Sequence, residues 1–176
     1  MVIYIIGFMG CGKSTSGKLL AQHLHYEFID LDILFQTKFK MNIPAYFEKF
    51  GEEAFRKSEY ELLREIDITK NLVVATGGGT PCFSDNMEYL KSTGITVYLQ
   101  LTPALLYKRL ASSHTVRPLV TGKKPDELKA WIEDSVKERT VYYKKAHVII
   151  DARNLSQSLL IRVLTPYLTQ AYPLNT

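Results

Sequence analysis

The segment Gly7-Phe8-Met9-Gly10-Cys11-Gly12-Lys13-Ser14 constrains the fold of this sequence more than any other feature. It matches the pattern G-x-x-x-x-G-K-[ST] and lies between an apolar run, Val2–Ile6, and a segment with helical spacing. Glycines in such a loop let successive backbone N–H groups turn toward phosphate oxygens, and the following helix points its partly positive N-terminus at the same anions. Because a chance glycine-rich turn would lack this context, the loop predicts binding of a nucleoside triphosphate, with ATP expected.

The residues of this phosphate loop have separate expected tasks. Lys13 reaches the β- and γ-phosphates, the Ser14 hydroxyl binds Mg²⁺, and Thr15 lies close to the α-phosphate. Gly10, Cys11 and Gly12 supply the backbone that surrounds the nucleotide phosphates. Cys11 occupies a variable position of the motif, where a small filler residue is expected rather than a redox group.

Five short apolar runs predict the strands of a sheet that is buried on both faces. They are Val2–Ile6, Tyr26–Ile29, Leu72–Ala75, Ile95–Leu99 and His147–Ile150, and their apolar character is nearly continuous. Segments with helical spacing separate them, so the chain is expected to be an α/β protein of three layers, with a parallel sheet between helices. Two more polar segments, Thr37–Gly51 and Ser112–Lys124, are expected as irregular inserts over one edge of the sheet.

Length and composition restrict the class of protein further. A chain of 176 residues, 46% of them apolar and 23% charged, predicts a single domain with a proper core. Its net charge of +4 fits a site for anions and gives no sign of a nucleic-acid partner. The two cysteines have no metal-ligand spacing, which indicates a reducing compartment. No apolar run has the length of a membrane span and the start lacks a basic leader, so a soluble cytoplasmic protein is expected.

Two carboxylates, Asp30 and Asp32, follow the second predicted strand. If the strand extends that far, alternation points both side chains the same way. One could then hold Mg²⁺ or its waters while the other accepts a proton from a hydroxyl group. The alternative is that Asp32 caps a helix that starts at Ile33. A cap alone does not require Asp30 as well, which favours the functional interpretation.

A glycine triplet and three arginines complete the candidate site. Gly77-Gly78-Gly79 follows the third predicted strand, at the edge where α/β sheets bind ligands, although a flexible loop is the alternative. Arg56, Arg117 and Arg139 come from separate segments. Guanidinium groups bind carboxylates and phosphates bidentately, so together they predict a small anionic substrate and a phosphoryl group. Taken singly, each arginine fits a solvated helix face better.

These segments together resemble the shikimate kinase family. The matching motifs are Gly-Phe-Met-Gly-Cys-Gly-Lys-Ser-Thr (7–15), Phe-Ile-Asp-Leu-Asp (28–32), Phe-Arg-x-x-Glu (55–59), Gly-Gly-Gly (77–79), Thr-Val-Arg-Pro-Leu (115–119) and Glu-Arg-x-x-x-Tyr (138–143). The phosphate loop alone is generic to many ATPases, whereas the ordered set is specific. The resemblance implies a fold of the nucleoside-monophosphate-kinase type, with a five-stranded parallel sheet. It also implies a substrate-binding insert at about residues 32–61 and a lid at about residues 112–124.

The resemblance also implies which residues bind the substrate. Its set is Asp32, Arg56, Gly77, Gly78, Gly79 and Arg139, with Glu59 as the acid that orients the substrate-site arginine. In this set Arg56 and Arg139 hold the substrate carboxylate, and Asp32 holds the ring hydroxyls, including the one that is phosphorylated. Phe47 and Phe55 resemble aromatic walls of the site, although packing in the core explains them almost as well.

At the nucleotide end the resemblance implies a second set of roles. Ser14 is the direct Mg²⁺ ligand, and Asp30 acts through water. Arg117 is the lid arginine that closes on the ATP phosphates, and Arg109 and Arg153 flank the adenine. Lys13, Arg117 and Mg²⁺ stabilise charge on the transferring group, while Asp32 orients the acceptor hydroxyl and takes its proton.

The activity implied is transfer of the γ-phosphoryl group of ATP to the 3-hydroxyl of shikimate, in the pathway to chorismate and the aromatic amino acids. Shikimate is then the expected small-molecule partner, with no nucleic acid and no membrane, and the chain is expected to be a monomer. Two alternatives stay open. One is a gluconate-type or nucleotide kinase of the same fold, and the other is a non-catalytic ATP-binding module.

Overall fold

Five parallel strands form the central sheet of the structure, a computed structural model that describes residues 1–112 and 122–171. The strands are β1 (Val2–Ile6), β2 (Glu27–Asp30), β3 (Leu72–Ala75), β4 (Ile95–Gln100) and β5 (Val148–Asp151), in the order β2-β3-β1-β4-β5. Each lies within about one residue of its predicted range. The connection after β1 leads toward β2 and the one after β3 toward β4, so the carboxyl ends of β1 and β3 border the crevice where such sheets bind ligands.

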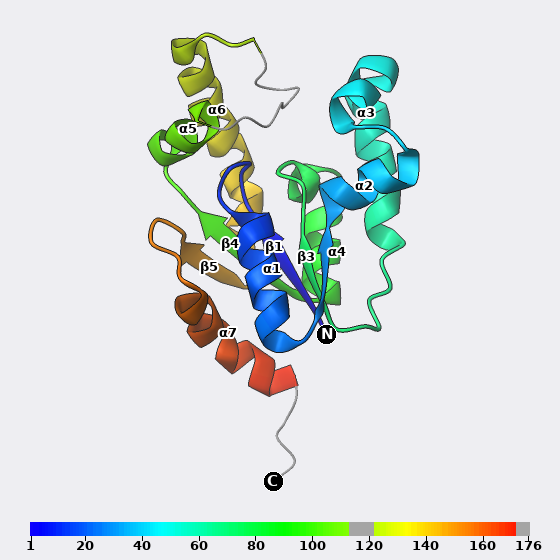
Figure 1. Cartoon of the computed structure of the whole chain (residues 1–176), viewed down its shortest axis with the longest axis vertical. Coiled ribbons are helices and arrows are strands. Elements are labelled where there is room, and N and C mark those ends of the chain that lie inside the picture. Colours follow the sequence, from blue (N-terminus) through cyan, green and yellow to red (C-terminus); the bar gives the residue numbers. More distant parts are fainter. Residues whose placement is uncertain (113–121, 172–176) are drawn as a thin grey trace.

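Helices cover the two faces of this sheet and complete the predicted three-layer architecture (Figure 1). The helices are α1 (Lys13–Leu24), α2 (Leu31–Phe39), α3 (Ile43–Arg64), α4 (Asn86–Thr93), α5 (Pro103–Ala111), α6 (Pro125–Tyr143) and α7 (Gln157–Ala171), with a short 3₁₀ helix, η1 (Thr80–Cys82). In Figure 1, α1 and α7 lie in front of the sheet and α4 lies behind it. Every residue of β1 is at most 1% exposed, which is the burial on both faces that its continuous apolar run predicts.

The prediction of an irregular insert over Thr37–Gly51 is wrong, because most of this segment is helical. The Asp30 carboxylate caps α2 by accepting from the N–H groups of Asp32 and Ile33, at 3.1 and 3.3 Å. Asn42 caps α3 by accepting from the N–H group of Ala45 at 2.8 Å. The two helices pack through a cluster of rings whose centroids lie 4.4–6.3 Å apart, namely Phe35, Phe39, Tyr46, Phe50 and Phe55.

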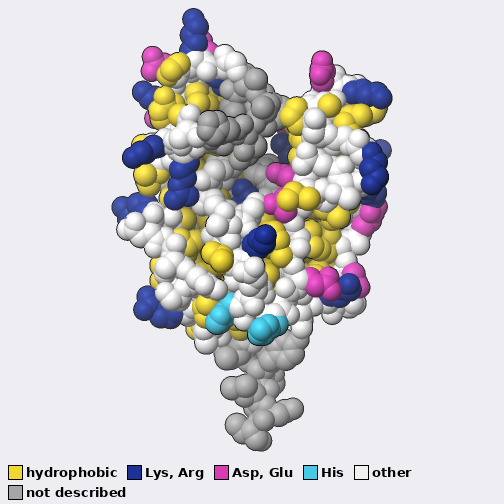
Figure 2. All heavy atoms as spheres, in the orientation of Figure 1, with side chains coloured by type: hydrophobic (Ala, Val, Ile, Leu, Met, Phe, Trp, Pro, Cys, Tyr) yellow, Lys and Arg dark blue, Asp and Glu magenta, His cyan; other side chains and the backbone are white. Residues whose placement is uncertain are grey.

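Two arms rise above the carboxyl edge of the sheet. One is formed by α2 and the first part of α3, and the other by α5 and the first part of α6 (Figure 1). The molecular surface is hollowed between them (Figure 2). In the first arm, α3 bends at Gly51, whose φ of 83° is non-helical. Most of the segment predicted as a lid, residues 113–121, lies outside the described residues. Among the described helices, none is both long and apolar enough to cross a membrane.

Candidate active site

The loop between β1 and α1 borders a cavity of about 280 Å³ at the carboxyl edge of the sheet. Its glycines Gly7, Gly10 and Gly12 have φ angles of 142°, 80° and 101°, which residues with side chains rarely adopt. The cavity is lined by Met9, Gly10, Gly12, Lys13, Ser14, Thr15, Asp30, Asp32, Thr76 and Gly78. The phosphate loop, the end of β2 and the loop after β3 therefore meet at one site. Thr76 and Met9 were not singled out from the sequence.

Lys13 lies inside the curve of this loop and is only 9% exposed. Its ammonium group donates to the carbonyl oxygens of Gly7 and Phe8, at 2.9 and 3.1 Å. These bonds join the two ends of the loop, so the loop keeps a fixed shape when it holds no phosphate. The neighbouring Cys11 is 2% exposed and packs in the core, which fits the expected filler rather than a reactive thiol.

Ser14 and Asp30 form the part of the cavity suited to a metal ion. The Ser14 hydroxyl donates to Oδ2 of Asp30 at 2.5 Å, which brings the two oxygen ligands together. No group of three or more His, Cys, Asp or Glu side chains that could hold a metal occurs among the described residues. Mg²⁺ typically takes one or two protein oxygens and fills its other positions with water and phosphate, so this sparse oxygen pair fits it.

The argument that placed Asp30 and Asp32 on one strand face is wrong, because β2 ends at Asp30 and Asp32 lies in the first turn of α2. The alternative that Asp32 is the helix cap is wrong too, since Asp30 is the residue that caps α2. Both carboxylates nevertheless line the cavity. A Cβ placed on Gly77 would lie 3.1 Å from Oδ1 of Asp32, so this carboxylate adjoins the glycine triplet.

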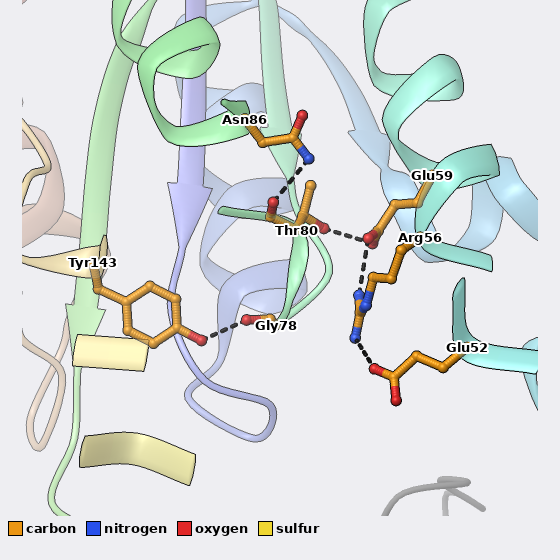
Figure 3. A network of polar contacts seen from close by, with 7 residues as sticks. All are labelled: Glu52, Arg56, Glu59, Gly78, Thr80, Asn86 and Tyr143. Carbon is orange, nitrogen blue, oxygen red and sulfur yellow. Dashed lines mark hydrogen bonds and ion pairs between the residues drawn. The ribbon is translucent and has the colours of Figure 1, made fainter. Parts of the chain in front are cut away.

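Arg56 and Glu59 stand one turn apart on α3 and face the glycine triplet (Figure 3). Nη1 of Arg56 donates to Oε2 of Glu59 at 2.9 Å, and Nη2 donates to Oε1 of Glu52 at 3.3 Å. A Cβ on Gly79 would lie 2.5–2.6 Å from the guanidinium group of Arg56, and one on Gly77 would lie 2.5 Å from Oε1 of Glu59. A side chain at either position would therefore force the side chains of this ion pair to shift.

Burial and charge act against each other in this ion pair. Burial raises the pKa of Glu59, although the charge of Arg56 and the hydroxyl of Thr80 pull it back. Burial also works against the charge of Arg56, but the carboxylates of Glu59 and Glu52 outweigh it, and the pKa of Arg56 is raised. Arg56 therefore stays a cation, held by acids on its own helix.

Arg139 reaches the site from α6 and differs from Arg56 in having no acid beside it in the described structure. Its guanidinium carbon lies 5.2 Å from the ring centre of Phe8 and 6.0 Å from that of Trp131. Its Nη1 is buried and has no hydrogen-bond partner among the described residues. Because buried donors are almost always paired, this N–H group is available to an acceptor from outside the described chain, either a bound ligand or an ordered water.

The sequence of this chain is similar to those of known enzymes. A sequence model of the shikimate kinase family matches residues 9–168. A shikimate kinase from Azobacteroides pseudotrichonymphae is 39% identical over 165 residues, which are 93% of this chain and 97% of that protein. The chain belongs to the shikimate kinase family.

Solved structures of shikimate kinases agree closely with the fold. The enzyme from Bacteroides thetaiotaomicron has a TM-score of 0.86 at 37% identity, and the match covers 99% of each chain. The enzyme from Acinetobacter baumannii, solved in complex with shikimate, has a TM-score of 0.84 at 38% identity, covering 95% of this chain and 94% of that one. The predicted α/β fold of the nucleoside-monophosphate-kinase type is thus confirmed.

A gluconokinase from Sinorhizobium meliloti shares this fold, with a TM-score of 0.62 at 16% identity over 99% of this chain. Likeness at that level concerns the fold alone. Membership of the shikimate kinase family therefore comes from the sequence, and it favours the main prediction over the gluconate-type alternative.

The structure separates the two arginines predicted beside the adenine of a shikimate kinase. Nη1 of Arg109 donates to the carbonyl oxygens of Cys11 and Gly10, at 3.3 and 3.4 Å, and so lies against the phosphate loop. Arg153 instead pairs with Asp151 at 2.6 Å and lines a second cavity of about 390 Å³ with Tyr98, Thr102 and Thr140, among others. Arg117 lies outside the described residues.

Sequence reasoning assigned no role to two residues that hold the glycine triplet of this kinase in place. The Tyr143 hydroxyl donates to the carbonyl oxygen of Gly78 at 2.5 Å, and the Thr80 hydroxyl donates to Oε1 of Glu59 at 2.6 Å (Figure 3). Tyr143 lies one helical turn after Arg139, so the spacing could have indicated a shared face. The sequence has no comparable signal for Thr80. The aromatic residues Phe47 and Phe55 stack with centroids 4.6 Å apart beside Arg56.

Proposed function

We propose that this chain transfers the γ-phosphoryl group of ATP to the 3-hydroxyl of shikimate, giving shikimate 3-phosphate and ADP. The name of its family, shikimate kinase, supports this activity. The observation that carries the assignment of substrate-binding residues is Nη1 of Arg139, a buried donor with no hydrogen-bond partner among the described residues. Burial raises the pKa of the Cys82 thiol to about 11, although the positive charges of Arg139 and Arg56 both lower it. Both arginines therefore lie near this partly buried thiol, and two neighbouring guanidinium groups suit a carboxylate.

The phosphate loop binds the nucleotide in this proposal. Lys13 and the backbone N–H groups of the loop hold the β- and γ-phosphates, and Thr15 lies near the α-phosphate. Ser14 directly, and Asp30 through water, would hold Mg²⁺, which when bound offsets negative charge on the phosphates. Arg109 contacts the loop through the carbonyl oxygens of Gly10 and Cys11, and its place beside the adenine remains a prediction from the family resemblance.

The acceptor end works through Asp32, Arg56 and Arg139. The two arginines fix the substrate carboxylate, and this orients the ring so that a hydroxyl meets Asp32. As the hydroxyl oxygen bonds to the γ-phosphorus, the bond from that phosphorus to the bridging oxygen breaks and ADP leaves. Asp32 takes the hydroxyl proton. Arg117 closing on the phosphates, and Arg153 flanking the adenine, remain predictions from the family resemblance.

One coupled assay tests the activity. We expect ADP release with shikimate as acceptor, and little with gluconate, with AMP or without any acceptor. ADP release at the same rate without acceptor would show an ATPase rather than a kinase. Release with gluconate but not with shikimate would contradict the substrate.

Replacing Arg139 by Gln is expected to raise KM for shikimate about 10- to 100-fold, because a hydrogen bond to a charged group contributes about 1.5–3 kcal/mol. KM for ATP stays within about twofold, since phosphate binding uses other groups. Steady-state kinetics with each substrate varied in turn measures both constants. Arg162→Gln, on the exposed side of α7, is the matched control. Equal rises in the two KM values would argue against carboxylate recognition by Arg139.

Two wider properties remain predictions from the sequence. The chain is expected to be a monomer, which light scattering coupled to size exclusion would measure. A cytoplasmic location is expected, which fractionation of cells with an antibody to the chain would test.

A further inference from the structure

We propose that the hydroxyl group of Thr80 is a positioning group for substrate binding, acting on Arg56 through Glu59 and touching no substrate itself. The inference rests on the proposed function, in which Arg56 binds the substrate carboxylate. Thr80 is the first residue of η1, directly after the glycine triplet, and it is completely buried.

Glu59 has one strong partner for each of its two oxygens. Oε2 accepts from Arg56 at 2.9 Å, and Oε1 accepts from Thr80 at 2.6 Å. Glu59 is 2% exposed. A buried carboxylate that loses one of two donors retains the cost of leaving water and has less to offset it. Without the Thr80 hydroxyl, Glu59 therefore binds a proton more readily or turns toward another donor, and either change loosens its hold on Arg56.

The backbone of Thr80 is held by a further contact, on the side away from Glu59 (Figure 3). Nδ2 of Asn86, on α4, donates to the Thr80 carbonyl oxygen at 2.9 Å. Oδ1 of the same Asn86 accepts from Nη1 of Arg64, on α3, at 2.7 Å. Hydrogen bonds thus link α3 to η1, η1 to α4, and α4 back to α3, the helix that carries Arg56 and Glu59. In this set of hydrogen bonds Thr80, which directly follows the glycine triplet, is linked to Arg56 through Glu59.

The charges around Glu59 set the sign of a pH effect. The charged groups that face it are Arg56 on its own helix and Asp32 on α2, and the partly buried Cys82 thiol lies nearby. Hydrogen bonding from Thr80 lowers the pKa of Glu59, whereas burial and Asp32 raise it. Removing the hydroxyl moves this pKa upward, so the acid limb of shikimate binding moves to higher pH.

The test compares Thr80→Val with the native enzyme in kinetics and in shikimate binding measured by calorimetry. We expect KM and Kd for shikimate to rise about tenfold, which is the effect of losing one hydrogen bond to a charged group. We expect KM for ATP to stay within about twofold, and the acid limb of kcat/KM for shikimate to shift to higher pH. Thr96→Val is the matched control, because Thr96 is a fully buried threonine with a hydroxyl contact at the opposite edge of the sheet.

A second pair of variants covers the case in which Thr80→Val does not fold. Thr80→Ser and Thr80→Ala both lack the methyl group and differ only in the hydroxyl, so Ser is expected to bind shikimate nearly as the native enzyme does and Ala to bind it weakly. In a Glu59→Gln background the effect of Thr80→Val shrinks, since the hydroxyl acts through Glu59.

Two outcomes overturn the inference while leaving the enzyme's activity established. One is shikimate binding by Thr80→Val or Thr80→Ala equal to that of the native enzyme. The other is a parallel loss for both substrates, which would show general disruption of the fold. Failure of the native enzyme to phosphorylate shikimate is a different result, and it would contradict the proposed function instead.

Discussion

Asp32→Asn is expected to lower kcat by at least about 100-fold, which is the lower end of what a positioned proton acceptor contributes. The amide keeps the size of the carboxylate but cannot take the proton of the acceptor hydroxyl. Asp32 also adjoins the glycine triplet and lines the cavity beside Ser14 and Asp30, which in the proposed function would place it between the phosphates and the acceptor. KM for ATP is expected to change little. The measurement is kcat at saturating ATP and shikimate.

The control for this variant is Asp67→Asn, on an exposed turn before β3 at the opposite edge of the sheet. It removes one carboxylate without touching the cavity. If Asp32→Asn turned over within a few-fold of the native enzyme while Asp67→Asn did the same, Asp32 would be neither the proton acceptor nor the group that orients the hydroxyl.

Lys13→Met is expected to lower kcat about 100- to 1,000-fold, the range found when one preorganised donor to a developing negative charge is removed. Methionine fills a similar volume without the ammonium group. Lys13 also joins the two ends of the phosphate loop through Gly7 and Phe8, so ATP binding weakens as well. The effect on binding is separated from the effect on kcat by measuring Kd for ATP through the fluorescence of Trp131. Trp131 is the single tryptophan, and its ring centroid lies 5.8 Å from that of Phe8 in the loop.

Lys18→Met is the matched control for Lys13. Lys18 lies on the same helix, α1, but is exposed. We expect it to leave both kcat and ATP binding unchanged. An unchanged kcat in Lys13→Met would remove Lys13 from the stabilisation of the transferring phosphoryl group.

The strands and the phosphate loop could be predicted because local sequence determines them. Burial on both faces requires nearly continuous apolar runs, and the turn of the loop requires glycine at Gly7, Gly10 and Gly12. The family resemblance could then name Arg56, Glu59 and Arg139, since their motifs occur in order. The structure adds how these side chains are held, which no motif states.

Features that depend on contacts distant in sequence could not be predicted in this way. The packing of the two helices of the insert depends on rings as far apart as Phe35 and Phe55, and the polar residues between them obscure that contact in the sequence. Asp30 caps α2 because the strand ends there, two residues before the Asp32 that the alternation argument needed it to reach. Thr80 gains its contact from Glu59, which precedes it by 21 residues. A threonine after three glycines carries no sign of this.

Arg139 is only partly buried as a residue, but its Nη1 is a buried donor with no hydrogen-bond partner among the described residues. A buried donor left unpaired lowers the free energy of unfolding by about 1–3 kcal/mol. In the proposed function a bound carboxylate would pair with this donor, so part of the binding free energy would come from satisfying it. The protein is then hardest to unfold, and least open to proteases, when substrate is plentiful. Supply of the substrate would in this way help to set how long each enzyme molecule survives.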